Sequence, residues 1–424
     1  MKGNDIMKDK IKIGWVGVGR RGKGMLEYVF AHFKDAEIAM LCEKYEPAME
    51  LGLKILREAG CAEPATTTEY DEILNNPDID AVIIMTPWAS RAEMAIKAMR
   101  AGKYVGIEVG CAFDLKECYD LIEAYEETGV PVMMLENCCY GRREMMALNI
   151  ADQGLYGEIV HCDGAYGHHL PKEELFKDIE EGRHYRINSY IQRNCEQYPT
   201  HELGPISKVL KLNRGNKMLT LSSFASKSGG LKQYAKDYLG EDSPYANMEY
   251  KHGDIIDTII TCINGETIHL RLDTTAPRAY YSRNFTVRGT KGLSSEEGNV
   301  VFFDGMEDGP KNKNNEEEMF KKYDHPLHKE YVSLGEKGGH GGMDWLVGRA
   351  FVEAVKNGTN TPIDAYDTAL WMSIAPLSEA SIAKGGAPVE VPDFTTGKWI
   401  NREPITEGKY CLDKVCVDDS VEIY

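Results

Sequence analysis

The sequence predicts an α/β N-terminal Rossmann domain, a doubly wound parallel sheet, followed by an α+β domain with a largely antiparallel open sheet. A glycine-rich turn follows the first apolar run, within residues 11–24. Apolar runs then alternate with helical spacing as far as residue 136, which is typical of a parallel sheet covered on both faces. From about residue 140 the runs are longer and alternate apolar with polar residues, which favours antiparallel strands. We therefore place the domains at 1–139 and 140–424, with the last helices packing back on the first domain.

The glycine-rich turn has the spacing G-x-G-x-x-G, formed by Gly17, Gly19 and Gly22. The first glycine permits a tight turn, the second lets the backbone approach a pyrophosphate, and the third lets the helix pack close to the strand. The helix that follows begins with unpaired N–H groups and a partial positive charge, which favour a phosphate. A glycine-rich turn without a ligand has the same spacing, so the motif needs support from its surroundings.

A second apolar run, residues 38–42, ends in Glu43, about 20 residues after the glycines. A carboxylate at this point can accept hydrogen bonds from both hydroxyls of a ribose. The same charge would repel a 2′-phosphate. The sequence therefore predicts NAD(H) rather than NADP(H) as the cofactor.

The other expected elements follow in chain order. In the first domain they are a helix at 47–59, a strand at 81–85, a helix at 90–101, a strand at 104–108, a helix at 114–128 and a strand at 132–136. In the second they are strands at 217–225, 255–263, 266–273, 284–288 and 299–303, a helix opening at Pro199, and helices at 343–357 and 364–385. We expect the polar residues 305–324 to form a solvated excursion and residues 385–424 an extended tail.

Composition narrows the class of protein. The chain has 424 residues, of which 42% are hydrophobic, enough for a sizeable core in two domains. Its net charge of −18 argues against nucleic acid or an anionic membrane as the partner. Eleven cysteines without C-x-x-C pairs favour reduced thiols. Because no run resembles a signal peptide or a membrane span, we expect a cytoplasmic protein.

Tyr198 and His201 are the strongest candidates for chemistry in the second half. They lie three residues apart where Pro199 suits the first turn of a helix, so both can face one site. A phenol and an imidazole there can exchange protons with a sugar hydroxyl or an acidic C–H. A buried Tyr–His hydrogen bond without any reaction fits the same residues.

Weaker candidates lie elsewhere in the second half. Glycines flank His340, where the backbone can approach a ligand. A cap of the following helix by Asp344 explains the segment equally well. Arg186 and Tyr280 are polar candidates for a sugar pocket. The histidines at 161, 168 and 169 have no cysteine or carboxylate at convincing ligand spacing, so we expect no metal site.

Together these motifs resemble the Gfo/Idh/MocA oxidoreductase superfamily over nearly the whole chain. The resemblance in the first domain rests on residues 17–22, 80–84 and 101–105. Dehydrogenases of the superfamily have Glu-Lys-Pro after the fourth strand, where the lysine aids proton transfer. This chain has Glu108-Val109-Gly110 instead, so that lysine is missing.

The departure is similar to glycoside hydrolase family 109, the NAD-dependent α-N-acetylgalactosaminidase type. Other short stretches resemble the same family, namely residues 136–140, 198–201, 204–205, 212–216, 289–292, 322–327, 338–344 and 385–389. The segment 166–185 is shorter than in the family, and Tyr185 stands where the family has tryptophan. Since that segment should line the sugar pocket, the resemblance leaves the sugar open.

The resemblance implies a glycosidase that uses tightly bound NAD in a transient redox cycle. NAD⁺ would take a hydride from C3 of the sugar, and the resulting ketone would make the C2–H acidic enough for a base to remove. The C1 oxygen would then leave, water would add at C1, and the hydride would return to C3. Such a reaction needs no pair of carboxylates of the usual glycosidase kind. Hexosaminides such as N-acetylgalactosaminides are the implied substrates.

The resemblance also implies roles for particular residues. His201 and Tyr198 would transfer protons. The implied sugar contacts are Glu136, Tyr166, Arg186 and Tyr280. The implied cofactor contacts are Gly17, Gly19, Arg20, Arg21, Gly22, Glu43, Trp88, Glu108 and His340. A buried structural acid is the alternative for Glu108, and a homo-oligomer is the implied assembly.

Two other functions remain open on the sequence. One is a net NAD-dependent sugar or inositol dehydrogenase, in which His201 replaces the missing lysine. The other is a nonenzymatic NAD(H)-sensing sugar-binding protein, because a fold does not fix a function.

Overall fold

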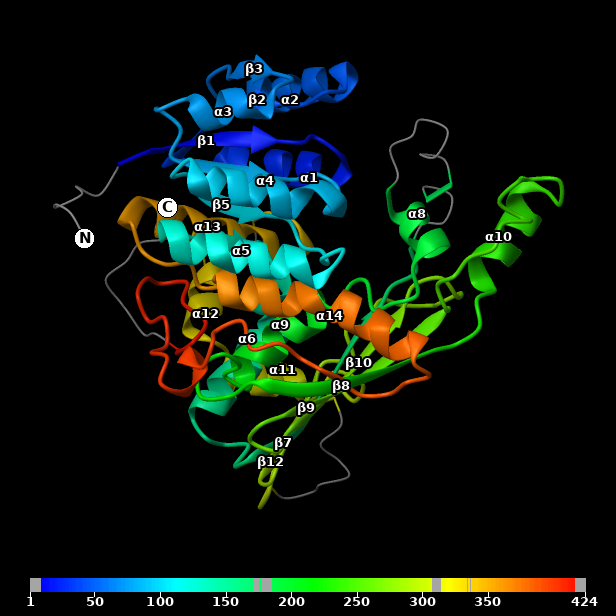
Figure 1. The fold of residues 1–424 in the computed structure, drawn as a ribbon. Helices are drawn as coiled ribbons and strands as arrows, with labels where there is room; N and C mark the ends of the chain where they lie inside the picture. The colour runs from blue at the N-terminus through cyan, green and yellow to red at the C-terminus, as the bar shows by residue number, and fades with distance from the viewer. Residues whose placement is uncertain are drawn as a thin grey trace.

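A computed structural model describes residues 9–170, 175–176, 185–306, 314–333, 335 and 337–415. Two sheets organise the chain, one above the other in Figure 1. The upper sheet has the order β3-β2-β1-β4-β5-β6, and all its pairs are parallel. Its strands are β1 (Ile11–Val16), β2 (Ala36–Cys42), β3 (Ala65–Thr67), β4 (Ala81–Ile84), β5 (Tyr104–Ile107) and β6 (Val132–Met134).

Helices cover both faces of the parallel sheet, which is why the four residues of β4 are completely buried. The helical segments from this half of the chain are α1 (Arg20–Tyr28), η1 (Phe30–His32), α2 (Glu46–Glu58), α3 (Tyr70–Asn75), α4 (Trp88–Arg100) and α5 (Leu115–Thr128). A helix from the far end of the chain, α13 (Met343–Asn357), also contacts β1. The predicted Rossmann fold is confirmed.

The lower sheet has the order β13-β12-β11-β7-β10-β9-β8-β14. Only the β7–β10 pair is parallel, so the prediction of a largely antiparallel sheet is also confirmed. Its strands are β7 (Ile159–Gly167), β8 (Met218–Ala225), β9 (Ile255–Cys262), β10 (Thr267–Asp273), β11 (Thr286–Gly289), β12 (Gly292–Ser295), β13 (Val300–Phe303) and β14 (Val389–Glu390).

The remaining helical segments complete the second half. They are η2 (Asn137–Tyr140), α6 (Arg142–Asp152), α8 (Tyr185–Gln192), α9 (Thr200–Val209), α10 (Gly230–Leu239), α11 (Glu316–Tyr323), α12 (Pro326–Ser333), η4 (His340–Gly342), α14 (Ala365–Ala383) and η5 (Lys398–Ile400). Helices α8 and α10 project to the right in Figure 1, around a small apolar cluster of their own. No helix of the described residues is long and apolar enough to cross a bilayer.

Helix α14 lies between the two sheets, and it is apolar on nearly every side because it has no solvent-facing stripe. It contacts α5 and β6 on one side and β8 and α9 on the other. Its Trp371 donates a hydrogen bond from Nε1 to Ser207 Oγ of α9 over 2.9 Å, and its Met372 carbonyl accepts from Ala112 N over 3.1 Å. Helix α14 therefore fixes α9 relative to the parallel sheet.

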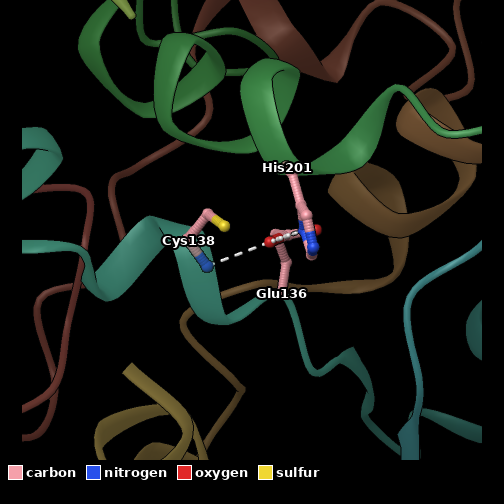
Figure 2. Close-up of side chains that lie close together, drawn as sticks. All are labelled: Glu136, Cys138 and His201. Atoms are coloured by element: carbon pink, nitrogen blue, oxygen red, sulfur yellow. Dashed lines mark hydrogen bonds and ion pairs between the residues drawn. The ribbon is translucent and has the colours of Figure 1, made fainter. Parts of the chain in front are cut away.

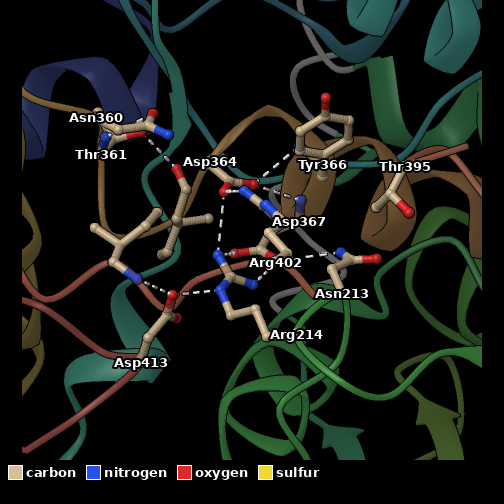
Figure 3. Close-up of polar contacts among 12 residues, drawn as sticks. Asn213, Arg214, Asn360, Thr361, Asp364, Tyr366, Asp367, Thr395, Arg402 and Asp413 are labelled. Carbon is tan, nitrogen blue, oxygen red and sulfur yellow. Dashed lines mark hydrogen bonds and ion pairs between the residues drawn. The ribbon is translucent and has the colours of Figure 1, made fainter. Parts of the chain in front are cut away.

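A buried ionic cluster fixes the start of α14 (Figure 3). Asp364 caps the helix by accepting hydrogen bonds from Tyr366 N and Asp367 N. Asp367 accepts from Lys208 Nζ and Arg214 Nη1, each over 2.7 Å. Burial disfavours the charged form of Asp367, but the charges of Arg214 and Lys208 outweigh it and hold the pKa of this carboxyl well below its usual range. The cluster therefore ties α9 to α14.

Two expectations need correction. Residues 314–324 are not a simple solvated excursion, because α11 buries Met319 and Phe320 against Arg142, whose guanidinium carbon lies 4.1 Å from the Phe320 ring centroid. The residues after 385 are not a free tail, because β14 pairs with β8 and the side chains of Val391, Phe394, Tyr410 and Leu412 are buried. Residues 307–313 and 416–424 lie outside the described residues, as do 171–174, 177–184 and the side chain of Tyr185.

Two strands of the lower sheet carry exposed apolar side chains. They are Phe224 on β8 and Ile259 on β9. The homo-oligomer and the domain boundary at 139/140 remain predictions.

Replacing Asp367 with alanine should lower the free energy of unfolding by about 3–5 kcal/mol, because it removes a buried counter-charge that Lys208 and Arg214 share and leaves only their other carboxylate partners. Urea unfolding followed by tryptophan fluorescence measures the change. The control is Asp78→Ala, since the Asp78 side chain is 71% exposed and its carboxylate lies 3.3 Å from Lys12 Nζ. That exposed pair should contribute less than about 1 kcal/mol. Equal losses in the two variants would contradict a stabilising role for the buried cluster.

Candidate functional site

The glycine turn has the geometry that a dinucleotide requires. Gly17 has φ of +92°, and its N donates to Cys42 O of β2 over 2.9 Å. A Cβ on Gly22 would lie 2.3 Å from Gly17 O, so α1 packs directly on the turn. A Cβ on Gly19 would meet nothing within 4 Å, which leaves open space at the N-terminal end of α1. These features fit a pyrophosphate beside Arg20 at the first turn of the helix.

Glu43 lies at the carboxyl end of β2 and faces the same turn. Its Oε2 accepts a hydrogen bond from Val18 N over 2.7 Å, and its Oε1 accepts from Tyr45 N over 2.9 Å. A carboxylate has about four lone-pair sites, so both oxygens can accept further hydrogen bonds from a diol. The position therefore fits a ribose contact.

A buried ion pair joins the glycine turn to the second half of the chain. The Arg21 guanidinium donates to both oxygens of Asp344, over 2.8 and 2.7 Å, and its Nε lies 3.3 Å from Glu108 Oε2. Asn137 Nδ2 and His340 Nδ1 lie 2.7 and 2.8 Å from the same carboxylate. Burial opposes the charge on Asp344, but its hydrogen bonds from Arg21 and His340 hold its pKa well below the usual range.

These contacts bear on two alternatives left open by the sequence. Asp344 does not cap α13, because the residue at the cap position is Gly342 and the Asp344 carboxylate binds Arg21 instead. Glu108 is a buried acid, and it is paired with Arg21. Whether Glu108 and His340 also contact a cofactor remains a prediction.

The missing lysine corresponds to Val109, whose side chain is 3% exposed, and the next residue, Gly110, is closely packed. A Cβ on Gly110 would lie 2.4 Å from the Trp88 ring and 2.6 Å from Arg91 Nη1. The Arg91 guanidinium cannot easily withdraw, since it donates to the carbonyls of Glu108 and Thr86 over 2.7 and 2.6 Å. Residue 110, the third position of the Glu-Lys-Pro pattern, therefore has no room for a side chain.

Glu136 and His201 form a hydrogen-bonded pair at the carboxyl end of β6 (Figure 2). His201 Nδ1 lies 2.8 Å from Glu136 Oε1, and the same oxygen accepts from Cys138 N over 3.0 Å. Because a charged carboxylate only accepts hydrogen bonds, we assign the imidazole proton to Nδ1, which leaves Nε2 as a base. Burial opposes the charge on Glu136, but the charge and hydrogen bond of His201 lower its pKa.

Among the His, Cys, Asp and Glu side chains of the described residues, one group of three comes close enough to hold a metal ion. It consists of Glu136, His201 and Cys138. Their ligand atoms lie within 4.8 Å of one another. His161, by contrast, bonds Thr267 on the lower sheet. The three residues are too few to close a structural metal site, and two of their atoms already share a hydrogen bond. The absence of a metal remains a prediction.

Aromatic side chains surround the Glu136–His201 pair. The Tyr198 ring stacks on Tyr166 with centroids 4.3 Å apart and meets the His201 ring edge-on at 4.9 Å. Trp88 lies 6.0 Å from Tyr198, and the Arg186 guanidinium lies 4.7 Å over the Tyr198 ring. Burial raises the pKa of Tyr198 well above its usual range, so its hydroxyl remains a proton donor at neutral pH. The structure thus brings together six of the predicted residues.

Tyr280 does not join this group. Its side chain is 68% exposed, and its ring lies 5.0 Å from the guanidinium carbon of Arg278. The next residue, Tyr281, has its ring centroid 6.4 Å from that of Tyr166, and its hydroxyl lies 3.4 Å from Arg283 Nη1. The adjacent Tyr-Tyr pair was a signal in the sequence, but only the backbone path decides which ring points inward.

Two family models match the chain, one in each half. A family model described as glycosyl hydrolase 109, C-terminal domain, matches residues 140–401. A second, described as oxidoreductase family, NAD-binding Rossmann fold, matches residues 11–136. The chain is 38% identical over 416 residues to the alpha-N-acetylgalactosaminidase of Tannerella forsythia, covering 93% of this chain and 88% of that protein.

The chain belongs to glycoside hydrolase family 109. A family 109 protein of Parabacteroides distasonis is likewise 38% identical, over 93% of this chain and 89% of its own length. The protein is thus a glycosidase built on an NAD-binding oxidoreductase fold, so the nonenzymatic alternative is not supported.

Solved structures share the fold at lower identity. A levoglucosan dehydrogenase in complex with NADH and levoglucosan has a TM-score of 0.67 and 19% identity, with 91% of this chain and 100% of that chain covered. The WlbA dehydrogenase of Bordetella pertussis, in complex with NADH and UDP-GlcNAcA, has a TM-score of 0.64 and 15% identity, with 92% and 99% covered. At this identity, the chain resembles these two structures in fold alone.

The glycine turn offers a matched pair of variants. We expect Gly22→Ala to purify with much less dinucleotide than the wild type, because the new methyl must displace the Gly17 carbonyl. Gly24→Ala should keep the dinucleotide, since its Cβ meets nothing within 4 Å and alanine favours the helix. Acid release of the bound nucleotide and its enzymatic assay measure the content. Equal contents would contradict a pyrophosphate at this turn.

Proposed function

We propose that this family 109 protein is an NAD-dependent glycosidase for hexosaminides such as N-acetylgalactosaminides. It would act by transient oxidation at C3, elimination across C1 and C2, addition of water and re-reduction. The observation that carries the proposal is the Glu136–His201 pair at the end of β6. The pair faces an aromatic wall, formed by the rings of Tyr166 and Tyr198, and it leaves one imidazole nitrogen as a base.

The cofactor part of the proposal rests on the glycine turn. Gly17, Gly19, Gly22 and Arg20 would hold the pyrophosphate, Glu43 the ribose, and Arg21, Trp88, Glu108 and His340 the remainder of the dinucleotide. When bound, NAD supplies reversible hydride transfer at a sugar carbon, which makes the neighbouring C–H acidic. The protein residues then need only to hold the sugar and to move protons.

His201 is the proposed base. Its Nε2 would take the acidic proton of the sugar, and the imidazolium that forms would be stabilised by the buried Glu136 carboxylate behind it. Tyr198, whose hydroxyl keeps its proton at neutral pH, would donate a hydrogen bond to a sugar oxygen. Because Glu136 Oε1 is already bonded to His201 and to Cys138 N, we propose a positioning role for it beside the predicted sugar contact.

The substrate part rests on the relatives and on the wall. The named relative in Tannerella forsythia is an alpha-N-acetylgalactosaminidase. The stacked Tyr166 and Tyr198 rings, with Arg186 over one of them, offer apolar faces and a cation to a sugar. We extend the sugar contacts to Tyr281, beside the predicted Tyr280.

A net sugar or inositol dehydrogenase is the second candidate, because structures of sugar dehydrogenases share the fold. Val109 argues against it, because this buried apolar side chain stands where dehydrogenases of the superfamily have the lysine that aids proton transfer.

One assay separates the two. Purified protein is incubated with p-nitrophenyl N-acetyl-α-galactosaminide and related hexosaminides without added NAD, while p-nitrophenol and NADH absorbance are recorded together. The proposal expects steady release of p-nitrophenol without accumulation of NADH, and deuterium from heavy water at C2 of the released sugar. Stoichiometric NADH from a free sugar would favour the dehydrogenase, and release without deuterium at C2 would exclude elimination.

His201→Ala should lower kcat by about 10²–10⁴-fold, the usual contribution of a general acid–base group. Release of p-nitrophenol at saturating substrate measures it. His161→Ala is the control, since this histidine bonds Thr267 on the lower sheet. An unaltered rate in the His201 variant would remove this residue from the mechanism.

The two neighbouring tyrosines can be compared directly. Tyr281→Ala should raise KM about tenfold, or about 1.4 kcal/mol of lost binding, because its ring lies against Tyr166. Tyr280→Ala should have the smaller effect, since its ring is exposed. Initial rates over a range of substrate concentrations give both KM values. The reverse order would restore Tyr280 as the sugar contact.

A further inference from the structure

Two acidic side chains bracket the catalytic segment and are completely buried. Glu196 stands two residues before Tyr198, and Glu202 follows His201 directly. Neither side chain has any solvent exposure. Charged groups in such a place are rare unless they are paired with a cation or a metal.

Neither carboxyl group has a cationic partner among the described residues. Glu196 Oε1 accepts a hydrogen bond from Tyr198 N over 3.1 Å, and Glu196 N donates to Ser378 Oγ of α14 over 2.8 Å. Glu196 Oε2 and both oxygens of Glu202 have no hydrogen-bond partner in the described part of the chain. Three buried carboxyl oxygens therefore need either a proton or bridging water.

The space around Glu202 is provided by the lower sheet. A Cβ on Gly164 of β7 would lie only 2.4 Å from Cβ of Glu202. Gly164 stands two residues before Tyr166, so the two positions share one face of the strand. Glu202 thus packs behind the aromatic wall, in a place where residue 164 cannot carry a side chain.

The charged groups that face Glu196 and Glu202 do not neutralise their carboxyl groups. They are Glu136 at the start of η2, Asp257 on β9, Arg283 before β11, and His201 on the same helix as Glu202. Arg283 is occupied by Glu144, at 2.6 Å, and His201 by Glu136.

Protonation is the remaining way to remove the charge. Burial, and after it the charge of Glu196, raise the pKa of Glu202 well above its usual range. Burial raises the pKa of Glu196 to about 8. Two neighbouring carboxyl groups in such a place cannot both be ionised at neutral pH.

We propose that Glu196 and Glu202 are positioning residues that keep at least one proton at neutral pH and hold the segment from Tyr198 to His201 between them. The protonated carboxyl donates to the other group, directly or through buried water, and Glu196 in turn holds the Tyr198 amide. This link joins Glu196, before α9, to Glu202 in the first turn of α9. The rings of Tyr198 and His201 thereby keep their positions beside Tyr166. The role as a positioning pair rests on the proposed function, whereas the retained proton does not.

The retained proton is tested first, without substrate. Infrared difference spectra between wild type and Glu202→Gln at neutral pH should show the carbonyl band of a protonated carboxyl, shifted in heavy water. Glu353→Gln is the control, because Glu353 is another acid whose pKa burial raises, far along the chain on α13. Loss of only carboxylate bands in both Glu202→Gln and Glu196→Gln would overturn the proposal, because either carboxyl group can carry the proton.

Stability against pH gives a second measure of the proton. A carboxyl whose pKa is higher in the folded protein than its unfolded value near 4.3 loses stability as pH rises between those values. The Tm of the wild type should therefore carry a component that falls between about pH 5 and 8, and Glu202→Gln should flatten that slope. Identical slopes in the two proteins would count against a retained proton.

Positioning is tested by a pair of variants with p-nitrophenyl substrate. Glu202→Gln keeps a neutral hydrogen-bonding group and should retain most of the wild-type kcat. Glu202→Leu removes the link and should lose about 10²-fold in kcat, the cost of a misplaced catalytic group, with little change in KM and no lower Tm. Unchanged kcat in the leucine variant would overturn the positioning role. A protein that hydrolyses no glycoside but shows the protonated band would instead refute only the proposed function.

Discussion

The rest of the site depends on the buried ion pair between Arg21 and Asp344. Arg21 lies in the glycine turn, whereas Asp344 stands at the start of α13, 323 residues later. The same carboxylate binds Asn137, and the residue before Asn137 is Glu136, which holds His201. Charge-assisted hydrogen bonds, together with the peptide link between Glu136 and Asn137, therefore join the glycine turn to the proposed base. Since a buried carboxylate without its cation is strongly destabilised, the two halves are held in one register.

The sequence predicts best those features that a short stretch of chain decides by itself. The turn at Gly17 and Gly22 is such a feature, because φ and close packing are local requirements. The inward direction of Tyr281 and the partner of Asp344 depend on residues far away in the chain, so no pattern in the sequence identified them. The helix α11 was missed because two apolar residues, Met319 and Phe320, are too few for a clear period among charges.

Family 109 shares its fold with dehydrogenases, so the difference in reaction has to lie in a few side chains. The position of Val109 is one such place, because a buried apolar side chain stands there instead of the lysine of the dehydrogenases. The proton-transfer role is one that we propose for a residue of another element, His201, in the first turn of α9. Its partner Glu136 comes from the end of β6, so the pair forms only when α14 holds α9 against the parallel sheet.

Carboxyl groups are plentiful around this site, yet none of the described ones is arranged like the pair of an ordinary glycosidase. Such a pair flanks the glycosidic bond, one acid on each side, with both groups open to the sugar. Here Glu136 lies behind an imidazole, Glu108 is bound to Arg21, and Glu196 and Glu202 are enclosed behind the aromatic wall. Each is withdrawn from the sugar by burial or by a partner. What remains is the imidazole of His201, with one nitrogen free to accept a proton. Such a base suits the removal of a C–H proton better than the protonation of a leaving group on either face of the sugar.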